Sequence, residues 1–339
     1  MNSRSLDANG RLRRRAACAA LLSLLTLPHS GFALVVGRKA RIGFLIEPPI
    51  DSGLQKAVLE PFRQGLRQLG YVEGQNVVLD VRSADGKFDR LPELAKELLR
   101  LEPDVLIAAF PAATMAAKDA TRTVPVVATS VDDPVVTGLA VTMARPGGNI
   151  TGISSFSQEV LAKRLQLVHE LVPNVRLIGV LINPNAGPST GLDTRIATWE
   201  RMLGTRIRVY EARGPDDFEG ALAAMARDQV GGLVVLADGN TYTHRVLLNQ
   251  LCLDRRMPSV WGGREFLTGG GVASYQSDFP AMFRRAAALA DKILKGDKPA
   301  EMPFEQATKL ELVIDKRAAK ALGITVSKAR LMSADVVLE

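Results

Sequence analysis

The chain has 339 residues, of which 47% are hydrophobic and 5% aromatic, and its formal net charge is +7. This length allows about two domains with buried cores, and so few aromatic residues disfavour a platform of stacked rings for nucleic acids or carbohydrates. The first 33 residues contain five arginines and one aspartate, so the rest of the chain carries only +3. It has no basic block, which excludes a typical nucleic-acid footprint.

The N-terminus has the pattern of a secretory signal peptide. Four arginines (Arg11 and 13–15) precede an apolar run at 16–27, and a small-x-small site ends at Ala33. The apolar run is shorter than the ~20 residues that a membrane-spanning helix needs. We therefore expect residues 1–33 to direct export to the periplasm, by the general or the twin-arginine route. Beyond them the chain has one cysteine, Cys252, which we expect to be a small buried apolar residue.

After the signal, short β-branched runs alternate with amphipathic helical patterns. The predicted strands are 41–46, 76–81, 104–108 and 124–128, and the predicted helices are 54–69, 89–99 and one that opens after Phe110-Pro111. Apolar strands separated by helices at intervals of roughly 25–30 residues are typical of a parallel sheet covered on both faces.

The same rhythm restarts after residue 153. It predicts helices at 158–171, 194–203, 216–227 and 241–255, and strands at 176–182, 206–211, 232–237 and 258–261. A strongly amphipathic helix at 278–295, a strand at 310–314 and a short helix between Asp315 and Gly323 complete the chain. The fold class is therefore α/β, with two successive doubly wound parallel-sheet units.

The motifs of common α/β enzymes are absent from the sequence. Glu47-Pro48-Pro49 follows the first strand in place of a glycine-rich dinucleotide loop, and neither a phosphate-binding GxxxxGK[ST] loop nor a GxSxG elbow occurs. Neither His169 nor His244 belongs to a cluster with metal-ligand spacing, and packing or surface roles fit them better. We expect no catalytic residue, no metal and no cofactor, and hence a protein that is not an enzyme.

Polar residues instead gather at the carboxyl ends of the predicted strands, where parallel sheets bind ligands. These segments are 47–52, 110–114, 130–133, 183–185, 238–240 and 262–265. Several have an ordinary alternative interpretation. Asp133 could cap the turn at Pro134, Asp238-Gly239 could be a plain turn, and Glu265 could cap a helix.

An ordered set of short motifs from residue 41 to the C-terminus resembles one family. The motifs are Phe62-Arg63-Gln64-Gly65-Leu66, Leu69-Gly70-Tyr71-Val72-Glu73-Gly74-Gln75-Asn76, Asp89-Arg90-Leu91-Pro92, Asp133-Pro134-Val135, the run at 144–152, Lys163-Arg164-Leu165, Arg264-Glu265-Phe266, Gly270-Gly271, Ser274-Tyr275, the run at 290–296 and the run at 309–314. Together they resemble the ABC-transporter substrate-binding proteins of the tryptophan/tyrosine-type uptake group.

This resemblance implies a type I periplasmic-binding fold, in which two lobes are joined by three crossovers and the ligand lies in the cleft. Carried onto this chain, lobe 1 is 40–152 plus 264–296, and lobe 2 is 153–263 plus 297–339. The implied ligand is an amino-acid-like or other small polar organic solute. The implied partners are an ABC permease and its ATPase, and we expect a monomer.

Within this frame we predict ten ligand-binding residues. Thr114, Ser130 and Asp133 form the floor in lobe 1, and Asn183, Asp238 and Glu265 act on closure, with Tyr275 as an apolar wall. The strand ends add Glu47, Ser52 and Phe110. A ligand-sensing subunit for a membrane signalling partner is the alternative function. A cytoplasmic repressor is disfavoured, because the signal peptide stands where its DNA-binding helices belong.

Overall fold

The computed structural model describes residues 38–50, 53, 55–155, 157–186 and 192–339. Contacts divide the chain into Met1–Arg38 and one compact unit, Lys39–Glu339, with which the following description is concerned. The predicted signal peptide lies outside the described residues. Within the described ranges, no helix is both long enough and apolar enough to cross a membrane.

The first lobe is built on six strands whose pairings are all parallel. Across the sheet they run β11 (Glu305–Gln306), β5 (Ile150–Ser154), β4 (Val126–Val131), β3 (Val105–Ala109), β1 (Ala40–Ile46) and β2 (Val77–Ser83). The covering helices are α3 (Glu60–Gln68), α4 (Leu91–Arg100), α5 (Pro111–Ala120) and α11 (Phe279–Leu294).

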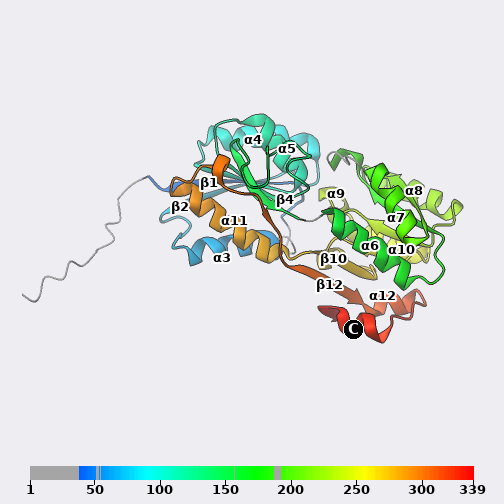
Figure 1. Cartoon of the computed structure of the whole chain (residues 1–339). Helices are drawn as coiled ribbons and strands as arrows, with labels where there is room; N and C mark the ends of the chain where they lie inside the picture. The colour runs from blue at the N-terminus through cyan, green and yellow to red at the C-terminus, as the bar shows by residue number, and fades with distance from the viewer. Residues whose placement is uncertain (1–37, 51–52, 54, 156, 187–191) are drawn as a thin grey trace, which may run out of the picture. The chain divides into compact units, whose positions relative to one another are not determined.

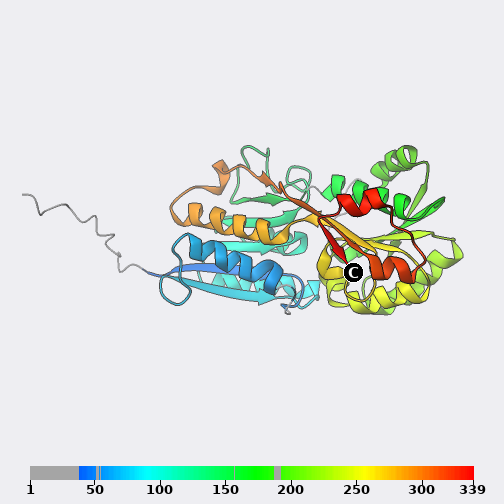
Figure 2. The same cartoon turned by 90° about the horizontal axis from the view of Figure 1, so that it is seen from below.

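Both faces of this sheet are buried because successive side chains of its strands point to opposite sides. In β1, Phe44 packs in one apolar cluster with Phe62 of α3 and Phe283 of α11. Leu45 packs in another cluster, with residues of α4 and α5. Figures 1 and 2 show α3 and α11 side by side on the sheet.

The second lobe has seven strands, of which one pair, β10 with β12, is antiparallel. Across the sheet they run β13 (Val336–Leu338), β12 (Leu310–Asp315), β10 (Ala273–Ser277), β9 (Ser259–Trp261), β8 (Gly232–Val235), β6 (Leu177–Ile182) and β7 (Arg206–Glu211). The longer helices are α6 (Ser157–Leu171), α7 (Leu192–Leu203), α8 (Pro215–Arg227) and α10 (Arg245–Asp254).

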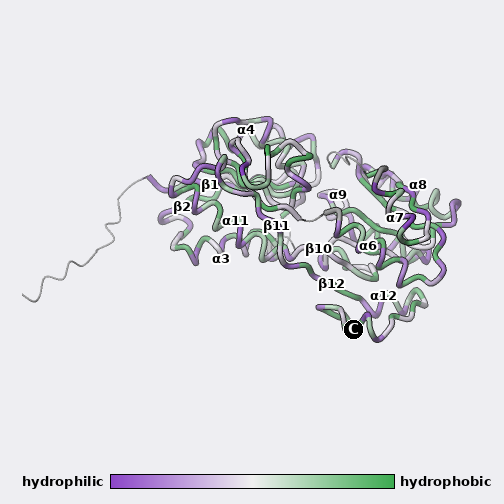
Figure 3. Tube along the Cα trace, in the orientation of Figure 1, coloured by the Kyte–Doolittle hydropathy of each residue, from purple (hydrophilic) through white to green (hydrophobic). Residues whose placement is uncertain are grey.

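Strand β8 shows how this second sheet is covered on both faces. Val234 packs in a cluster with residues of α6 and α7, whereas Leu233 and Val235 pack with residues of α8 and α10. In Figure 3, hydrophobic segments run along the strands and hydrophilic segments lie along outer turns and helices. The predicted class, α/β with two doubly wound parallel-sheet lobes, is confirmed.

The chain passes three times between the lobes: from β5 to α6, from β10 to α11, and from β11 to β12. The strand pairings show that the last two crossovers lie at other residues than the expected lobe boundaries. Residues 264–277, expected in lobe 1, include β10, which pairs with β9 and β12 in the second sheet. Residues 297–306, expected in lobe 2, include β11, which pairs with β5 in the first sheet. These short strands are assigned by partners distant in sequence, which local patterns do not show.

Two predicted helices are divided in the structure. The helix at 54–69 consists of a π-helical turn, η1 (Gln55–Leu59), and then α3, whose second residue is Pro61. Pro61 has no N–H to donate to a continuing ladder. The helix at 241–255 is divided at His244 into α9 (Gly239–Thr243) and α10. By contrast, Asp315 caps α12 (Lys316–Ala321) as predicted, and Asp278 caps α11.

Candidate functional site

A cavity of about 250 Å³ lies between the carboxyl ends of the two sheets. It is close to the lower end of the range for small-molecule sites, about 300–1,000 Å³, so it suits a small ligand. Its lining comes from both lobes. The first lobe and the crossovers contribute Glu47, Phe110, Met115, Ser130, Asp132, Ser155 and Phe279, and the second contributes Arg164, Asn183, Trp199, Asp238, Tyr242, Glu265, Phe266, Gln276 and Ser277.

Glu47 is a buried acid at the end of β1, with only 2% of its surface exposed. Its Oε1 accepts hydrogen bonds from the backbone N–H groups of Ala112 (2.5 Å) and Ala113 (3.1 Å), so it closes the N-terminus of α5. Burial raises the pKa of Glu47 to about 8, and the Asp238 carboxyl adds to the rise, while the two N–H groups oppose it. Glu47 therefore carries a proton over much of the neutral range.

Two cavity residues hold the backbone in the left-handed region. Phe110, before α5, has φ +78°, and Ser130, in β4, has φ +56°. Such conformations cost non-glycine residues on the order of 1–3 kcal/mol and cluster at functional sites. The Phe110 ring packs edge-on against Phe279, with 5.4 Å between the ring centroids. The Phe110 ring thus forms part of the cavity wall.

On the second lobe, Asp238 caps α9. Its Oδ1 accepts hydrogen bonds from the N–H groups of Asn240 (2.6 Å) and Thr241 (2.8 Å). Its Oδ2 is buried and has no hydrogen-bond partner among the described residues, and the same is true of Nδ2 of Asn183. Burial raises the pKa of Asp238 while the N–H groups that it caps lower it. The Asn183 amide also lowers the pKa of Asp238, so these two groups lie near one another in the cavity lining.

A glycine pair after β9 lets several polar groups converge. A Cβ at Gly263 would lie 2.1 Å from Nε2 of Gln276 and 2.7 Å from Oε2 of Glu265, so only glycine permits their approach. This Oε2 is a further buried atom without a hydrogen-bond partner in the described part of the chain. Burial raises the pKa of Glu265. The carboxyl is therefore poised to pair with a donor in the cavity.

Arg164 of α6 lies beside the same glycine pair. Its Nε donates to the carbonyl of Tyr275 (2.7 Å) and its Nη2 to the carbonyl of Gly262 (3.4 Å). Only 8% of its surface is exposed. Burial lowers its pKa to about 10, which leaves it charged at neutral pH. The site therefore contains a buried cation as well as buried acids.

The rest of the wall is apolar and partly aromatic. Phe266 stacks on Trp261 (5.8 Å between centroids) and meets Tyr242 edge-on (5.3 Å). Other apolar groups in the lining are Met115, Leu139, Val160, Leu161, Leu192, Trp199 and Leu236. Such a surface suits the side chain of a ligand, while the unpaired polar atoms suit its charged end.

Six of the ten predicted residues line the cavity, namely Glu47, Phe110, Ser130, Asn183, Asp238 and Glu265. Ser52 lies outside the described residues. The other three do not line it. Thr114 is fully buried and donates to the carbonyl of Phe110 (2.9 Å), and Tyr275 contributes its carbonyl to Arg164. Asp133 accepts from the N–H groups of Val135 (2.8 Å) and Val136 (3.2 Å), as the turn-capping alternative requires.

The sequence did not single out Arg164, Gln276 or the aromatic residues of α7 and α9 as site residues. Lys163-Arg164-Leu165 carried part of the family resemblance, but Arg164 lies in a helix whose pattern indicates ordinary amphipathic packing. The one sequence feature that could have indicated Arg164 is its position as a charged residue next to Leu165, which is buried in the helix packing. That signal is weak, because its burial depends on β9 and β10, which lie about a hundred residues later.

The two histidines and the cysteine of the described chain take part in packing or in hydrogen bonds within the protein. Nδ1 of His169 bonds Oγ1 of Thr205 (3.0 Å), and His244 packs against Phe218. Cys252 is buried in an apolar cluster, which raises its pKa to about 12. Over the ranges that the structure describes, no group of three metal-ligating side chains is found.

Two lobes joined by three crossovers, with a polar and apolar cavity between them, define a ligand-binding protein of the type I periplasmic-binding class. The profile of the family described as ABC transporter substrate binding protein matches residues 48–338, and the chain belongs to this family.

Known relatives agree with this assignment. A tyrosine-binding protein from Clostridioides difficile is 24% identical over 283 residues, which cover 84% of this chain and 80% of that protein. The crystal structure of a conserved domain protein from Vibrio cholerae is 27% identical and has a TM-score of 0.79, with 88% of this chain and 100% of that chain covered. An ABC domain from Streptococcus pneumoniae in complex with L-Trp is 23% identical with a TM-score of 0.80, over 89% and 100% of the two chains.

Proposed function

We propose that this protein is the exported substrate-binding component of an ABC importer and that its ligand is a free amino acid with an aromatic side chain. The observation that carries the proposal is the cavity itself. It joins an aromatic wall to a cluster of buried polar groups with unsatisfied hydrogen-bonding capacity. The names of the tyrosine-binding relative and of the L-Trp complex support the same ligand class.

A ligand screen tests the ligand class. L-Tyrosine and L-tryptophan should raise the unfolding temperature, since a ligand at 100 times its Kd adds about 2.7 kcal/mol. Nucleosides, sugars and aliphatic amino acids serve as comparison ligands, and calorimetry should then give the Kd. The ligand should be recovered chemically unchanged, because the protein binds and does not react. If nucleosides or sugars stabilise the protein and no amino acid does, the proposed ligand class is wrong.

Export is tested on the N-terminus of the protein recovered from the periplasm. Cleavage after Ala33 should leave a mature chain that begins at Leu34, and mass spectrometry would show it. An intact N-terminus on the exported protein would contradict the proposed signal peptide.

Delivery to a permease distinguishes import from ligand sensing. The liganded protein should stimulate ATP hydrolysis by its permease–ATPase complex in proteoliposomes, whereas the ligand alone should not. Stimulation of a sensor kinase in place of the ATPase would favour the sensing alternative.

A further inference from the structure

Arg164 is a buried cation that lacks an acidic partner. Its two hydrogen bonds go to neutral backbone carbonyls, and no carboxylate of the described residues forms an ion pair with it. A guanidinium has five N–H donors, so these bonds leave others available. A buried charge without a counter-charge is costly. An anionic group in the cavity would remove that cost. Arg195 also lines the cavity, but it is half-buried and its charge has less need of a partner.

The buried acids of the second lobe lie near the same glycine pair, Gly262 and Gly263. A Cβ at Gly262 would lie 3.5 Å from Nη2 of Arg164 and 2.7 Å from the methyl group of Ala237. Ala237 precedes Asp238, whose Oδ2 is buried and unpartnered within the described chain. The guanidinium and the acid therefore border one small region, with Oε2 of Glu265 next to it at Gly263.

Two opposite charges in adjacent subsites match one chemical group. A free α-amino acid carries a carboxylate and an ammonium on the same carbon, so the two must lie close together. An amine offers only the cation, and a carboxylic acid offers only the anion. Oxygen acceptors on two acids suit an ammonium with three N–H donors, whereas a guanidinium suits a carboxylate in a two-pronged bond.

On the basis of the proposed function, we propose that Arg164 binds the α-carboxylate of the ligand and that Asp238, with Glu265 beside it, binds the α-ammonium. The site then selects free zwitterionic amino acids over amines, deaminated acids and amino-acid esters. Arg164 and Asp238 determine this specificity, while the aromatic wall receives the side chain.

The test compares three ligands that share one side chain: L-tyrosine, tyramine, which lacks the carboxylate, and 3-(4-hydroxyphenyl)propionate, which lacks the ammonium. The wild-type protein should bind tyrosine at least about tenfold more tightly than either analogue, as expected for the loss of a charged hydrogen bond. R164M should weaken tyrosine and the propionate at least tenfold and leave tyramine unchanged. D238N, which can still cap α9, should weaken tyrosine and tyramine and leave the propionate unchanged.

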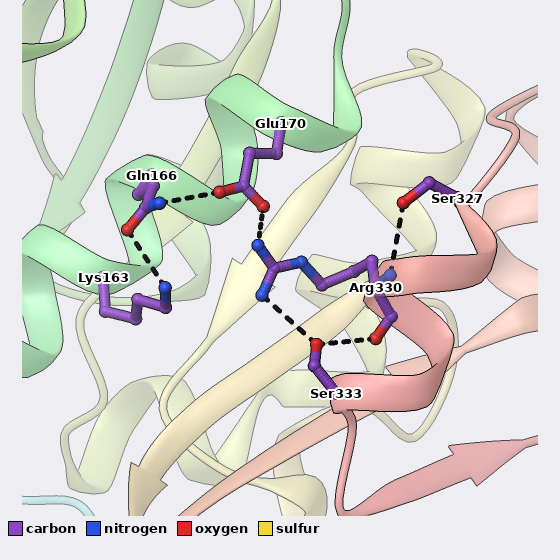
Figure 4. Close-up of polar contacts among 6 residues, drawn as sticks. All are labelled: Lys163, Gln166, Glu170, Ser327, Arg330 and Ser333. Carbon is purple, nitrogen blue, oxygen red and sulfur yellow. Dashed lines mark hydrogen bonds and ion pairs between the residues drawn. The ribbon is translucent and has the colours of Figure 1, made fainter.

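The matched control is K163M, the neighbouring cation on α6. Lys163 donates to Gln166, whose amide in turn bonds Glu170 of the same helix (Figure 4), and Lys163 does not belong to the cavity lining. Its loss should therefore leave all three affinities unchanged. If R164M folds poorly, R164K serves as the charge-conserving variant and should retain the preference for tyrosine over tyramine.

Equal binding of tyrosine and tyramine by the wild type would overturn the proposal and leave an amino-acid importer intact. A uniform loss across all three ligands in R164M would also overturn it, since that is the result expected for a purely structural arginine. If another amino acid binds and tyrosine does not, the same series is made on that amino acid. Absence of binding by any amino acid would overturn the proposed function itself.

Discussion

At the scale of single residues, the site is marked by acids placed where water is excluded. Glu47 from the first lobe and Asp238 from the second each cap a helix, and each has a raised pKa. The Asp238 carboxyl adds to the rise in the pKa of Glu47 only where the lobes meet, because the two residues come from different lobes. Protonation of Glu47 is therefore coupled to the contact between the lobes.

The pH dependence of stability should reveal Glu47. Its pKa is about 8 in the folded protein and near 4.5 in the unfolded chain. The folded state then holds a proton that the unfolded state releases, so this contribution to stability is full below pH 4.5 and is lost as the pH rises towards 8, by up to about 4 kcal/mol. E47Q removes the ionisation but keeps an oxygen for Ala112 and Ala113. Its stability should fall below the wild type at pH 5 and approach or exceed it at pH 8.

Thermal unfolding of both proteins from pH 5 to pH 8 measures this difference. E159Q, at an exposed acid in the first turn of α6, is the control. A difference between wild type and E47Q that changes with pH no more than that of E159Q would contradict the assignment.

A site residue was predictable from the sequence where its position after a strand is enough to place it at the cavity. Glu47 and Asn183 follow buried strands directly, Asp238 comes three residues after β8, and parallel strands bring such positions to one edge. Asp133 and Thr114 also follow strands, but a local turn and a local helix bond direct their side chains elsewhere. Arg164 was not predictable, since α6 meets β9 and β10 only in the folded chain.

At the scale of elements, the hydrophobic periodicity of the sequence predicted the long apolar strands and helices, but it did not predict the short polar ones. The hydrophobic runs of β1, β3 and β6 were predicted to within a residue or two. The strand β10, with the sequence Ala-Ser-Tyr-Gln-Ser, has no such run and exists through pairing with β9 and β12. The crossovers use these short strands, so the division into lobes was the least predictable part of the fold.

The C-terminal helix α13 (Lys328–Ser333) is attached to α6 by a polar network. Arg330 forms an ion pair with Glu170, and Gln166 donates to the same carboxylate (2.7 Å), as Figure 4 shows. Ser327 caps α13 through the N–H of Arg330. This network ties the last helix to the helix that carries Arg164.

A double-mutant cycle on Glu170 and Arg330 should give a coupling free energy of about 0.5–1 kcal/mol, because the pair is only partly buried. E170Q and R330M should each lower the stability, and the double variant should lose less than the sum. Added salt should reduce the coupling. The exposed pair Glu93–Arg100 on α4 is the control and should couple more weakly. A coupling at Glu170–Arg330 that is no larger than this control would contradict an anchoring role.

At the scale of the whole molecule, we expect the three crossovers to act as a hinge between the two lobes. Ligand binding shifts the population towards the closed state only if the ligand contacts both lobes, and the cavity lining comes from both. The lobes also touch directly. A Cβ at Gly239 of the second lobe would lie 3.2 Å from the backbone of Glu47 and Pro48 in the first.

Gly239 therefore offers a way to wedge the lobes apart. A valine there would push against backbone atoms that cannot move aside, so G239V should disfavour the closed state while each lobe remains folded. Apparent affinity falls with the fraction of protein that is competent to bind, so a tenfold smaller closed fraction should weaken the binding of L-tyrosine about tenfold.

X-ray scattering measures the closure. Tyrosine should reduce the radius of gyration of the wild type, and at equal concentration it should reduce that of G239V less. G148V, at an exposed glycine with open space around its Cβ position, should behave as the wild type. Tight binding by the wild type without any change in its dimensions would show that ligand capture does not require hinge closure.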